Sequence, residues 1–375
     1  MNARVRRSAS RPNYTTLDLF AGCGGLTEGF TAVRGQEGRF VPVAAVELDE
    51  FAAATYAANF GPHIHQGGIE DWIGSTVPKV DVVVGGPPCQ GFSSLGRRDP
   101  GDGRNKLWRF YAEAVALAEP AYFVLENVVP FLRSAQFRDL EILTRPGEIL
   151  QDYELNATSV VASEFGAAQK RHRAVVIGRR RGLPPLDLEA QSRPARTVRE
   201  VIGNTPRTVH QQDLPDRTAH VRAANKVIGV PGIFRTPELH VTRHYTQLSL
   251  DRFREIPEGG NRHHLPDRLR AKCWLDHPGG SHDVMGRLHW DRPSVTIRTE
   301  FWKPEKGRYL HPDADRAITH MEAALLQGFP PDFRWCGNKV SIGRQIGNAV
   351  PVELGSAIAR ALLVALRDAG RPPVA

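Results

Sequence analysis

Cys89 is the residue in this chain best placed to act as a nucleophile. It follows two glycines and two prolines, residues 85–88, which come directly after the apolar run 80–84. The apolar run predicts a buried strand, while the glycines permit a tight turn and the prolines stiffen it. A thiol held at the edge of a sheet by a rigid turn is typical of a reactive cysteine. On this motif alone, a structural cysteine in a Pro/Gly turn is the alternative.

A second set of residues suits a nucleoside ligand. Residues 20–25 read FAGCGG and separate an expected strand, 14–20, from a helix that begins near residue 26. Such a turn lets backbone approach a ligand closely, and the helix offers free N–H groups. Glu47 ends the next expected strand, 41–47, where an acidic residue commonly holds ribose hydroxyls. The alternative for Glu47 is a solvated carboxylate at a strand end.

The glycine pattern also favours one cofactor over another. A dinucleotide usually requires a GxGxxG turn for its pyrophosphate, and this chain has FAGCGG instead. S-adenosylmethionine carries no phosphate and requires room only for its ribose and methionine ends. The turn therefore favours S-adenosylmethionine.

Glu126 is a candidate general acid. It follows the apolar residues 122–125, and apolar surroundings raise the pKa of a carboxyl group so that it holds a proton near neutral pH. A helix-capping carboxylate beside Asn127 is the alternative.

The elements that must position these residues alternate between strand and helix. This alternation predicts an α/β fold, doubly wound, with a mostly parallel sheet, helices on both faces and ligand sites at the carboxyl ends of the strands. The expected strands are 14–20, 41–47, 80–84, 122–126, 156–162 and 173–177, and the expected helices begin near residue 26 and cover 50–60, 107–118 and 352–366.

The bulk composition limits the class of protein. Four cysteines without a CxxC pair argue against a disulfide framework and fit a reducing cytoplasm. No apolar stretch is long enough to span a bilayer, so no membrane association is expected. A net charge of +8 is compatible with a polyanionic partner. We predict no metal site, because the spacing of the scattered residues His263, His264, Cys273, His277 and His282 matches no standard zinc finger.

Several motifs, taken together and in order, resemble the cytosine-C5 DNA methyltransferase family of bacterial restriction–modification systems. They are the glycine turn with Glu47, the cysteine loop 85–93 (GGPPCQGFS), ENV at 126–128, QKRHR at 169–173, RPSVT at 292–296 and GNAVP at 347–351. The resemblance covers roughly 14–180 and 290–366. It implies a discontinuous methyltransferase domain over 14–182 and 291–375 and a small irregular target-recognition domain over 183–290. Residues 1–13 are expected to form a disordered basic arm.

The resemblance implies a covalent mechanism and roles for four catalytic residues. Cys89 would add to C6 of a flipped-out cytosine, which makes C5 reactive enough to take a methyl group. Glu126 would hold the base at N3 and its amino group. Arg173, with Arg171, would stabilise the ring and orient the loop.

The resemblance also implies the residues that bind cofactor and DNA. The pocket for S-adenosylmethionine would be lined by Phe20, Ala21, Gly22, Gly24, Gly25, Glu47, Leu48, Ile69, Pro87, Asn348 and Ala349. Contacts to DNA, or within the catalytic loop, would come from Gln90, Ser93, Arg97, Arg98, Arg104, Asn127, Gln169 and Thr296. Residues 91–106 contain four glycines and several charges, which suits a lid that closes on DNA; an ordinary solvated loop is the alternative.

Two positions depart from the family pattern. Gly68 stands where the family usually has an aspartate that contacts adenine, and Glu70 and Asp71 lie beyond the aligned position. Leu48 stands where many members have a large aromatic residue. From both departures we expect a changed adenine contact and looser binding of the cofactor, with the chemistry unaffected.

The leading hypothesis is a DNA cytosine-C5 methyltransferase that recognises a specific double-stranded sequence. We expect a cytoplasmic, nucleoid-associated monomer, with a restriction endonuclease for the same site as a genetic partner. The same chemistry on transfer RNA and a non-catalytic nucleic-acid-binding homologue are the alternatives. A nicotinamide oxidoreductase is disfavoured, because GxGxxG is missing and the Cys89 loop is present.

Overall fold

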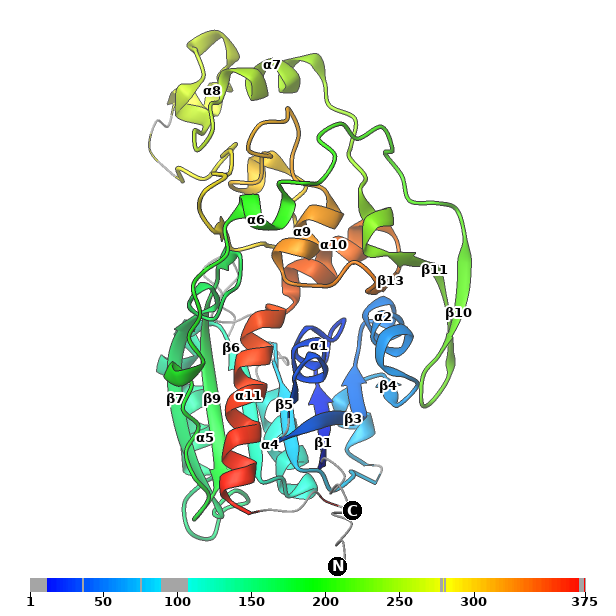
Figure 1. Ribbon diagram of the computed structural model, residues 1–375, viewed down its shortest axis with the longest axis vertical. Coiled ribbons are helices and arrows are strands. Elements are labelled where there is room, and N and C mark those ends of the chain that lie inside the picture. Colours follow the sequence, from blue (N-terminus) through cyan, green and yellow to red (C-terminus); the bar gives the residue numbers. More distant parts are fainter. Residues whose placement is uncertain are drawn as a thin grey trace, which may run out of the picture.

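A mostly parallel eight-stranded sheet forms the lower half of the molecule in Figure 1. The computed structural model describes residues 12–35, 37–74, 76–88, 107–276, 279, 281–370 and 374. The strand order is β2-β3-β1-β5-β6-β9-β7, with β4 paired to β3. The strands are β1 (Asn13–Leu19), β2 (Arg34–Gly35), β3 (Gly38–Glu47), β4 (Ile64–Gln66), β5 (Val82–Gly85), β6 (Tyr122–Asn127), β7 (Tyr153–Val161) and β9 (His172–Arg180). The predicted α/β class with a mostly parallel sheet is confirmed; β2, β7 and β9 pair antiparallel.

Helices cover both faces of this sheet, which explains why its central strands are apolar on both sides. Val82 and Val84 pack in one cluster with residues of α1 (Gly25–Ala32) and α11 (Val352–Asp368). Val83, between them, points to the opposite face and packs with α4 (Leu107–Ala118). The remaining helices near the sheet are α2 (Glu50–Phe60), α3 (Ile69–Trp72) and α5 (Ala135–Ile142).

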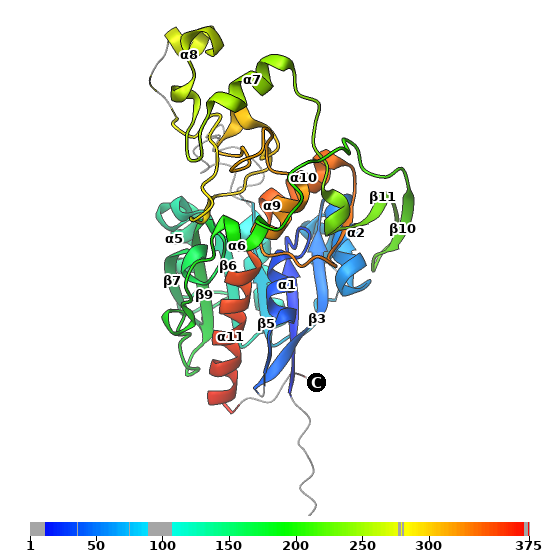
Figure 2. The same ribbon diagram turned by 45° about the horizontal axis from the view of Figure 1, so that its top comes forward.

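The last helix returns the chain to its first part. α11 lies alongside α1 in both views (Figures 1 and 2). The two helices approach closely at Gly29, where a Cβ would lie 2.6 Å from the Val352 carbonyl oxygen. No single helix in the described ranges is long and apolar enough to cross a membrane; one pair bent by 41°, α10 (Lys339–Asn348) with α11, passes by length and composition alone.

A second, three-stranded antiparallel sheet joins distant parts of the sequence. It has the order β10 (Thr218–Arg222), β11 (Val227–Arg235), β13 (Arg334–Cys336). The hairpin β10–β11 lies beside α2 and β4, with Val221, Ile228 and Val230 in one apolar cluster with Ala53 and Tyr56. This part of the predicted recognition region therefore contacts the edge of the main sheet.

The rest of the chain has little regular structure. Its elements are α6 (Val198–Ile202), α7 (Gln247–Glu255), α8 (Lys272–Asp276), α9 (His320–Leu326), the strand pair β8 (Gln169–Lys170) and β12 (Ser294–Val295), and the 3-10 turns η2 (Val129–Arg133), η3 (Ala162–Glu164), η4 (Glu189–Gln191), η5 (Thr236–Leu239), η6 (Arg262–His264), η7 (Asp267–Leu269) and η8 (Pro304–Lys306). We call residues 245–276, 281–290 and 304–316 the arginine-braced lobe; α7 and α8 lie at the top of Figure 1.

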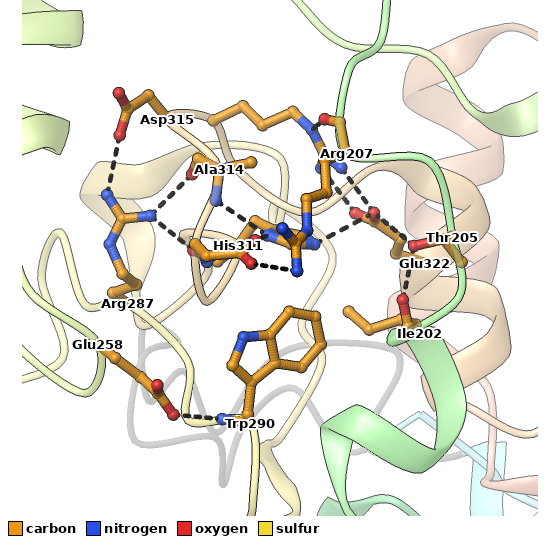
Figure 3. A network of polar contacts seen from close by, with 12 residues as sticks. Ile202, Thr205, Arg207, Glu258, Arg287, Trp290, His311, Ala314, Asp315 and Glu322 are labelled. Carbon is orange, nitrogen blue, oxygen red and sulfur yellow. Dashed lines mark hydrogen bonds and ion pairs between the residues drawn. The ribbon is translucent and has the colours of Figure 1, made fainter.

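Buried arginines replace secondary structure in this lobe (Figure 3). The Arg287 guanidinium donates to the carbonyl oxygens of Phe253, Ile256, His311 and Ala314 and to the Asp315 carboxylate. Buried carbonyl groups require a donor, and Arg287 supplies one to each of these four; the carbonyls of Phe253 and Ala314 also accept from the backbone N–H groups of Ile256 and Arg316. The lobe is thus held by long side chains around a small apolar cluster that includes Phe253 and Ile256.

Candidate active site

Glu126 and Arg173 form an ion pair at the carboxyl end of β6. The antiparallel strand β9 brings the two together, since Glu126 lies opposite Val175 in the register. Arg173 Nε lies 2.6 Å from Glu126 Oε1, and the side chains are only 15% and 11% exposed. A charge-assisted hydrogen bond of this length fixes the carboxylate in one orientation.

The root of the cysteine loop lies directly beside this carboxylate. A Cβ on Gly86 would lie 3.1 Å from Glu126 Oε2, so a glycine at this position lets the loop approach the carboxylate closely. Asn127 Nδ2 donates to the Pro87 carbonyl oxygen at 3.1 Å, while Asn127 Oδ1 accepts from Val128 N. Glu126 and Asn127 therefore both contact the backbone that leads to residue 89.

Arg171 holds the backbone of three residues next to the site. Its guanidinium is buried and donates to the carbonyl oxygens of Ile297, Gly347 and Asn348. Burial, together with the charge of Arg173, lowers the pKa of Arg171 to about 9. Arg171, directly before β9, thus connects that strand to the backbone of Gly347 and Asn348, and Asn348 is predicted to line the cofactor pocket.

The first glycine turn has the geometry of a ligand-binding loop. Phe20, Gly22 and Gly24 have positive φ values of 59°, 56° and 91°. A Cβ on Gly22 would meet nothing within 4 Å, so open space lies above the turn. A Cβ on Gly25 would lie 2.6 Å from the Val350 carbonyl oxygen, so the turn packs tightly on the segment that follows Asn348.

Glu47 presents its carboxylate to this turn. Oε2 accepts from Gly22 N and Oε1 from Asp49 N, both at 2.8 Å. Burial raises the pKa of Glu47. Each carboxylate oxygen has a further lone pair after accepting one N–H, so Glu47 can still accept hydroxyl groups. The turn and Glu47 therefore fit a nucleoside with a free ribose.

The adenine side of the predicted pocket has a different construction from the family pattern. Ile69 is buried, whereas Leu48 is 71% exposed. A Cβ on Gly68 would lie 2.7–2.9 Å from the carboxylate of Glu70, so that carboxylate folds back over Gly68. The position of the missing aspartate side chain is thus occupied by the acidic group two residues later.

Known proteins match this chain over most of its length. The model of the C-5 cytosine-specific DNA methylase family matches residues 14–363. The chain belongs to this family. The type II methyltransferase M1.HphI of Haemophilus parahaemolyticus is 32% identical over 94% of this chain and 87% of its own length. The type II methyltransferase M.AgeI of Thalassovita gelatinovora is 28% identical over 94% and 99%.

Solved structures share the fold. A prophage-encoded E. coli protein of the DNA modification methyltransferase type superposes with a TM-score of 0.69 at 23% identity, over 94% of this chain and 99% of that one. The Dnmt2 methyltransferase of S. pombe gives 0.57 at 15%, over 95% and 99%. These structures show the fold. The family match and the type II relatives show that the chain is a DNA cytosine-C5 methyltransferase of the restriction–modification type, with DNA as its partner and S-adenosylmethionine as the family's methyl donor.

The residues predicted to contact DNA are only partly described. Cys89, Gln90, Ser93, Arg97, Arg98 and Arg104 lie outside the described residues. Thr296 is accessible, and its Oγ1 donates to the Lys170 carbonyl oxygen at 2.7 Å. Gln169 is fully buried, and its amide bonds with Ile297 N, the Leu326 carbonyl and the Gln327 side chain. Gln169 lies two residues before the buried Arg171, a spacing that in extended backbone puts both side chains on the same side.

Two polar features of this methyltransferase were not predicted from the sequence. Asp18, in β1, is buried below the glycine turn and accepts from Thr27 Oγ1 at 2.6 Å; burial raises its pKa to about 7. The sequence signal is a carboxylate between two leucines, Leu17 and Leu19, at the end of the strand. Asn225, in the turn of the β10–β11 hairpin, contacts Gln66 at the end of β4. No local pattern links residues 159 positions apart.

Proposed function

We propose that this methyltransferase transfers a methyl group from S-adenosylmethionine to C5 of a cytosine flipped out of a specific double-stranded DNA sequence, through addition of Cys89 to C6. The observation that supports it most is the buried Glu126–Arg173 pair, against which the backbone of Gly86 and Pro87 packs, two residues before Cys89.

The chemistry requires both a thiolate and a carboxyl group. C5 of cytosine is a weak nucleophile; a bond from the Cys89 sulfur to C6 moves the C5–C6 π electrons toward C5. Glu126 assists by holding a proton at N3 and accepting a hydrogen bond from the amino group. Arg173 keeps the carboxylate in place. After methylation, loss of the C5 proton returns its electron pair to the ring and expels the thiolate.

The cofactor supplies an electrophilic methyl group on a sulfonium sulfur. The chain's own residues would bind its nucleoside: Glu47 for the ribose hydroxyls, the 20–25 turn for close backbone approach, and Ile69, Pro87 and Ala349 for its apolar surfaces. Arg171 would act by holding the backbone of Asn348 rather than by touching substrate.

DNA binding would involve the loop that follows Cys89. The target carbon is stacked inside the duplex, so the base must leave the helix before Cys89 can reach it. Gln90, Ser93, Arg97, Arg98, Arg104 and Thr296 would contact the DNA or the displaced strand, and residues 183–290 would supply the specificity. We further propose a monomer that acts in the bacterial cytoplasm and has a restriction endonuclease for the same site as its genetic partner; the endonuclease is supported by relatives named type II methyltransferases.

The test is expression in a host that lacks cytosine methylation. The wild type, Cys89→Ser and Cys273→Ser would be compared by conversion sequencing of the host DNA; Cys273 is an exposed cysteine on α8 and serves as the matched control. We expect 5-methylcytosine at one short motif with the wild type and Cys273→Ser, and none with Cys89→Ser. Methylation by Cys89→Ser would refute the nucleophile, and methylation of transfer RNA alone would refute the substrate.

A further inference from the structure

The turn of the β10–β11 hairpin extends the main sheet beyond β4. The turn, residues 223–226, closes with a hydrogen bond from Ala223 N to the Lys226 carbonyl oxygen at 2.8 Å. Its Ala224 N donates to the Ile64 carbonyl oxygen, also at 2.8 Å. β4 pairs with β3 on its other side, so the turn covers an edge that would otherwise expose backbone groups.

Asn225 continues this pairing with its side chain. Its Oδ1 accepts from Gln66 N and its Nδ2 donates to the Gln66 carbonyl oxygen, each at 3.0 Å. The amide thus makes the two bonds that a residue of a neighbouring strand would make. An amide side chain is suited to this because it carries one acceptor and one donor group; a carboxylate could accept but not donate.

Gln66 in turn connects to the segments predicted to hold the adenosine. Its Nε2 donates to the Leu48 carbonyl oxygen at 2.7 Å, directly after Glu47. The next residue, Gly67, donates its N–H to the Glu47 carbonyl oxygen at 3.0 Å and leads into Gly68 and Ile69. Gln66 and Gly67 therefore connect the end of β4 to residues 47 and 48 on the ribose side and lead directly into the adenine side of the predicted pocket.

The segment after Gln66 needs such a brace. Gly67 and Gly68 are two successive glycines, which restrict the backbone least of all residues. A pocket wall that is ordered before the ligand arrives binds it more tightly, because the cost of ordering is not taken from the binding free energy. The hairpin itself is anchored by Val221, Ile228 and Val230 in an apolar cluster, so it does not depend on the Asn225 amide.

We propose that Asn225 is a positioning residue for the cofactor: through Gln66 it holds segments 47–48 and 67–69 in the conformation that receives the adenosine. A hairpin from the predicted recognition region would thereby complete the cofactor pocket of the methyltransferase domain. This inference rests on the proposed function, since it requires S-adenosylmethionine to bind at Glu47 and Ile69.

The test compares Asn225→Ala with Val227→Ala, which changes an exposed residue of the same hairpin. Isothermal titration with S-adenosylmethionine should give a Kd raised about three- to tenfold in Asn225→Ala, the effect of losing one or two solvent-exposed hydrogen bonds. The cofactor KM should rise likewise, with kcat at saturating cofactor, DNA affinity and the melting temperature unchanged. Val227→Ala should match the wild type, and Asn225→Asp should not restore affinity, because its carboxylate would face the Gln66 carbonyl.

Three results would overturn the inference. An unchanged cofactor Kd in Asn225→Ala means that the brace has no effect on binding. An equal loss of cofactor and DNA affinity with a lower melting temperature means a merely structural role. Failure of the wild type itself to bind S-adenosylmethionine refutes the proposed function, and the inference with it, which distinguishes this case from the other two.

Discussion

At the carboxyl edge of the main sheet, Arg171 is buried, but some of its N–H donors make no hydrogen bond among the described residues. In the arginine-braced lobe and where it meets α9, Arg287 and Arg316 are also buried, but each uses all of its N–H donors. Arg171 bonds three carbonyl oxygens, and its Nε has no partner among the described residues. Arg287 makes five hydrogen bonds, and Arg316 also makes five, two of them to Glu322 at 2.7 Å. A guanidinium has five N–H donors, so Arg287 and Arg316 have every donor occupied.

This difference separates two uses of buried charge. In the lobe, charges substitute for secondary structure, and their removal should lower the stability of the fold. At the sheet edge, Glu126 points one oxygen at Arg173 and the other at the root of the Cys89 loop. Removal of a charge there should lower the rate of the reaction more than the stability.

The largest expected effect is on catalysis, in Glu126→Gln. The amide keeps the shape of the side chain but cannot hold the proton at N3, so we expect the rate of methyl transfer to fall about 10²–10⁴-fold. The free energy of unfolding should fall by no more than about 1–2 kcal/mol, because one hydrogen bond at a partly open edge is weakened. Single-turnover methyl transfer and urea unfolding would measure the two effects. A rate above one tenth of the wild type would contradict the assignment.

The second prediction concerns the lobe side, in Arg316→Met. Glu322 is fully buried, and hydrogen bonds and charge from Arg316 outweigh the desolvation that would raise its pKa. Removal of Arg316 takes the neighbouring positive guanidinium from this buried carboxylate, which still accepts from Thr319 N and Thr205 Oγ1, at a cost of about 3–5 kcal/mol of unfolding free energy. The double variant Arg316→Met/Glu322→Met should lose less unfolding free energy, since it leaves no buried carboxylate without its guanidinium.

Arg217→Met is the control for that measurement. Arg217 pairs with Glu238 at 2.7 Å, but the side chains are 39% and 34% exposed, so its removal should cost about 1 kcal/mol or less. Equal losses for Arg316→Met and Arg217→Met in urea unfolding would mean that the saturated arginines do not hold the fold.

The same difference explains what could be predicted from the sequence. The strands that carry Glu47 and Glu126 have local signals, apolar runs that end in a carboxylate, and the structure places both residues at the carboxyl ends of strands. The hairpin β10–β11 and helix α7 were not predicted, although β11 alternates between exposed and buried residues. Their partners are remote: Arg287 bonds carbonyls 24 to 34 residues away. Periodicity reports which face of an element is buried, but not which distant carbonyl a long side chain reaches.

A third prediction uses pH, because the two regions respond with opposite sign. Burial lowers the pKa of His311, in the lobe, to about 4, despite the opposing charge of Glu322. Below pH 6.5, His311 is therefore protonated in the unfolded chain but still neutral in the folded lobe. The free energy of unfolding consequently falls as the pH falls toward 4. Asp18 has its pKa raised to about 7, so between pH 7 and 4 the folded chain binds the extra proton and stability rises as the pH falls.

Two variants separate these contributions. His311→Asn keeps an acceptor for the N–H groups of Asp313 and Ala314 but does not titrate. Between pH 7 and pH 5 it should lose about 2 kcal/mol less unfolding free energy than the wild type, whereas Asp18→Asn should lose about 2 kcal/mol more. Urea unfolding at the two pH values measures both differences. A change of the same sign in both variants would contradict the assignment of charges to the two regions.

The smallest expected effect is a gain at the sheet edge, in Leu48→Phe. Leu48 is 71% exposed beside Glu47 and makes the predicted adenine side of the pocket apolar but not aromatic. A phenyl ring there would offer the adenine a stacking surface, and we expect the Kd for S-adenosylmethionine to fall about three- to tenfold. Ile149→Phe, at a residue 50% exposed after α5, controls for added surface apolarity. Tighter binding in Leu48→Phe alone, at an unchanged melting temperature, would mean that the sheet edge, unlike the lobe, can still gain contacts. Tighter binding in both variants, or in neither, would mean that the adenine does not bind beside residue 48.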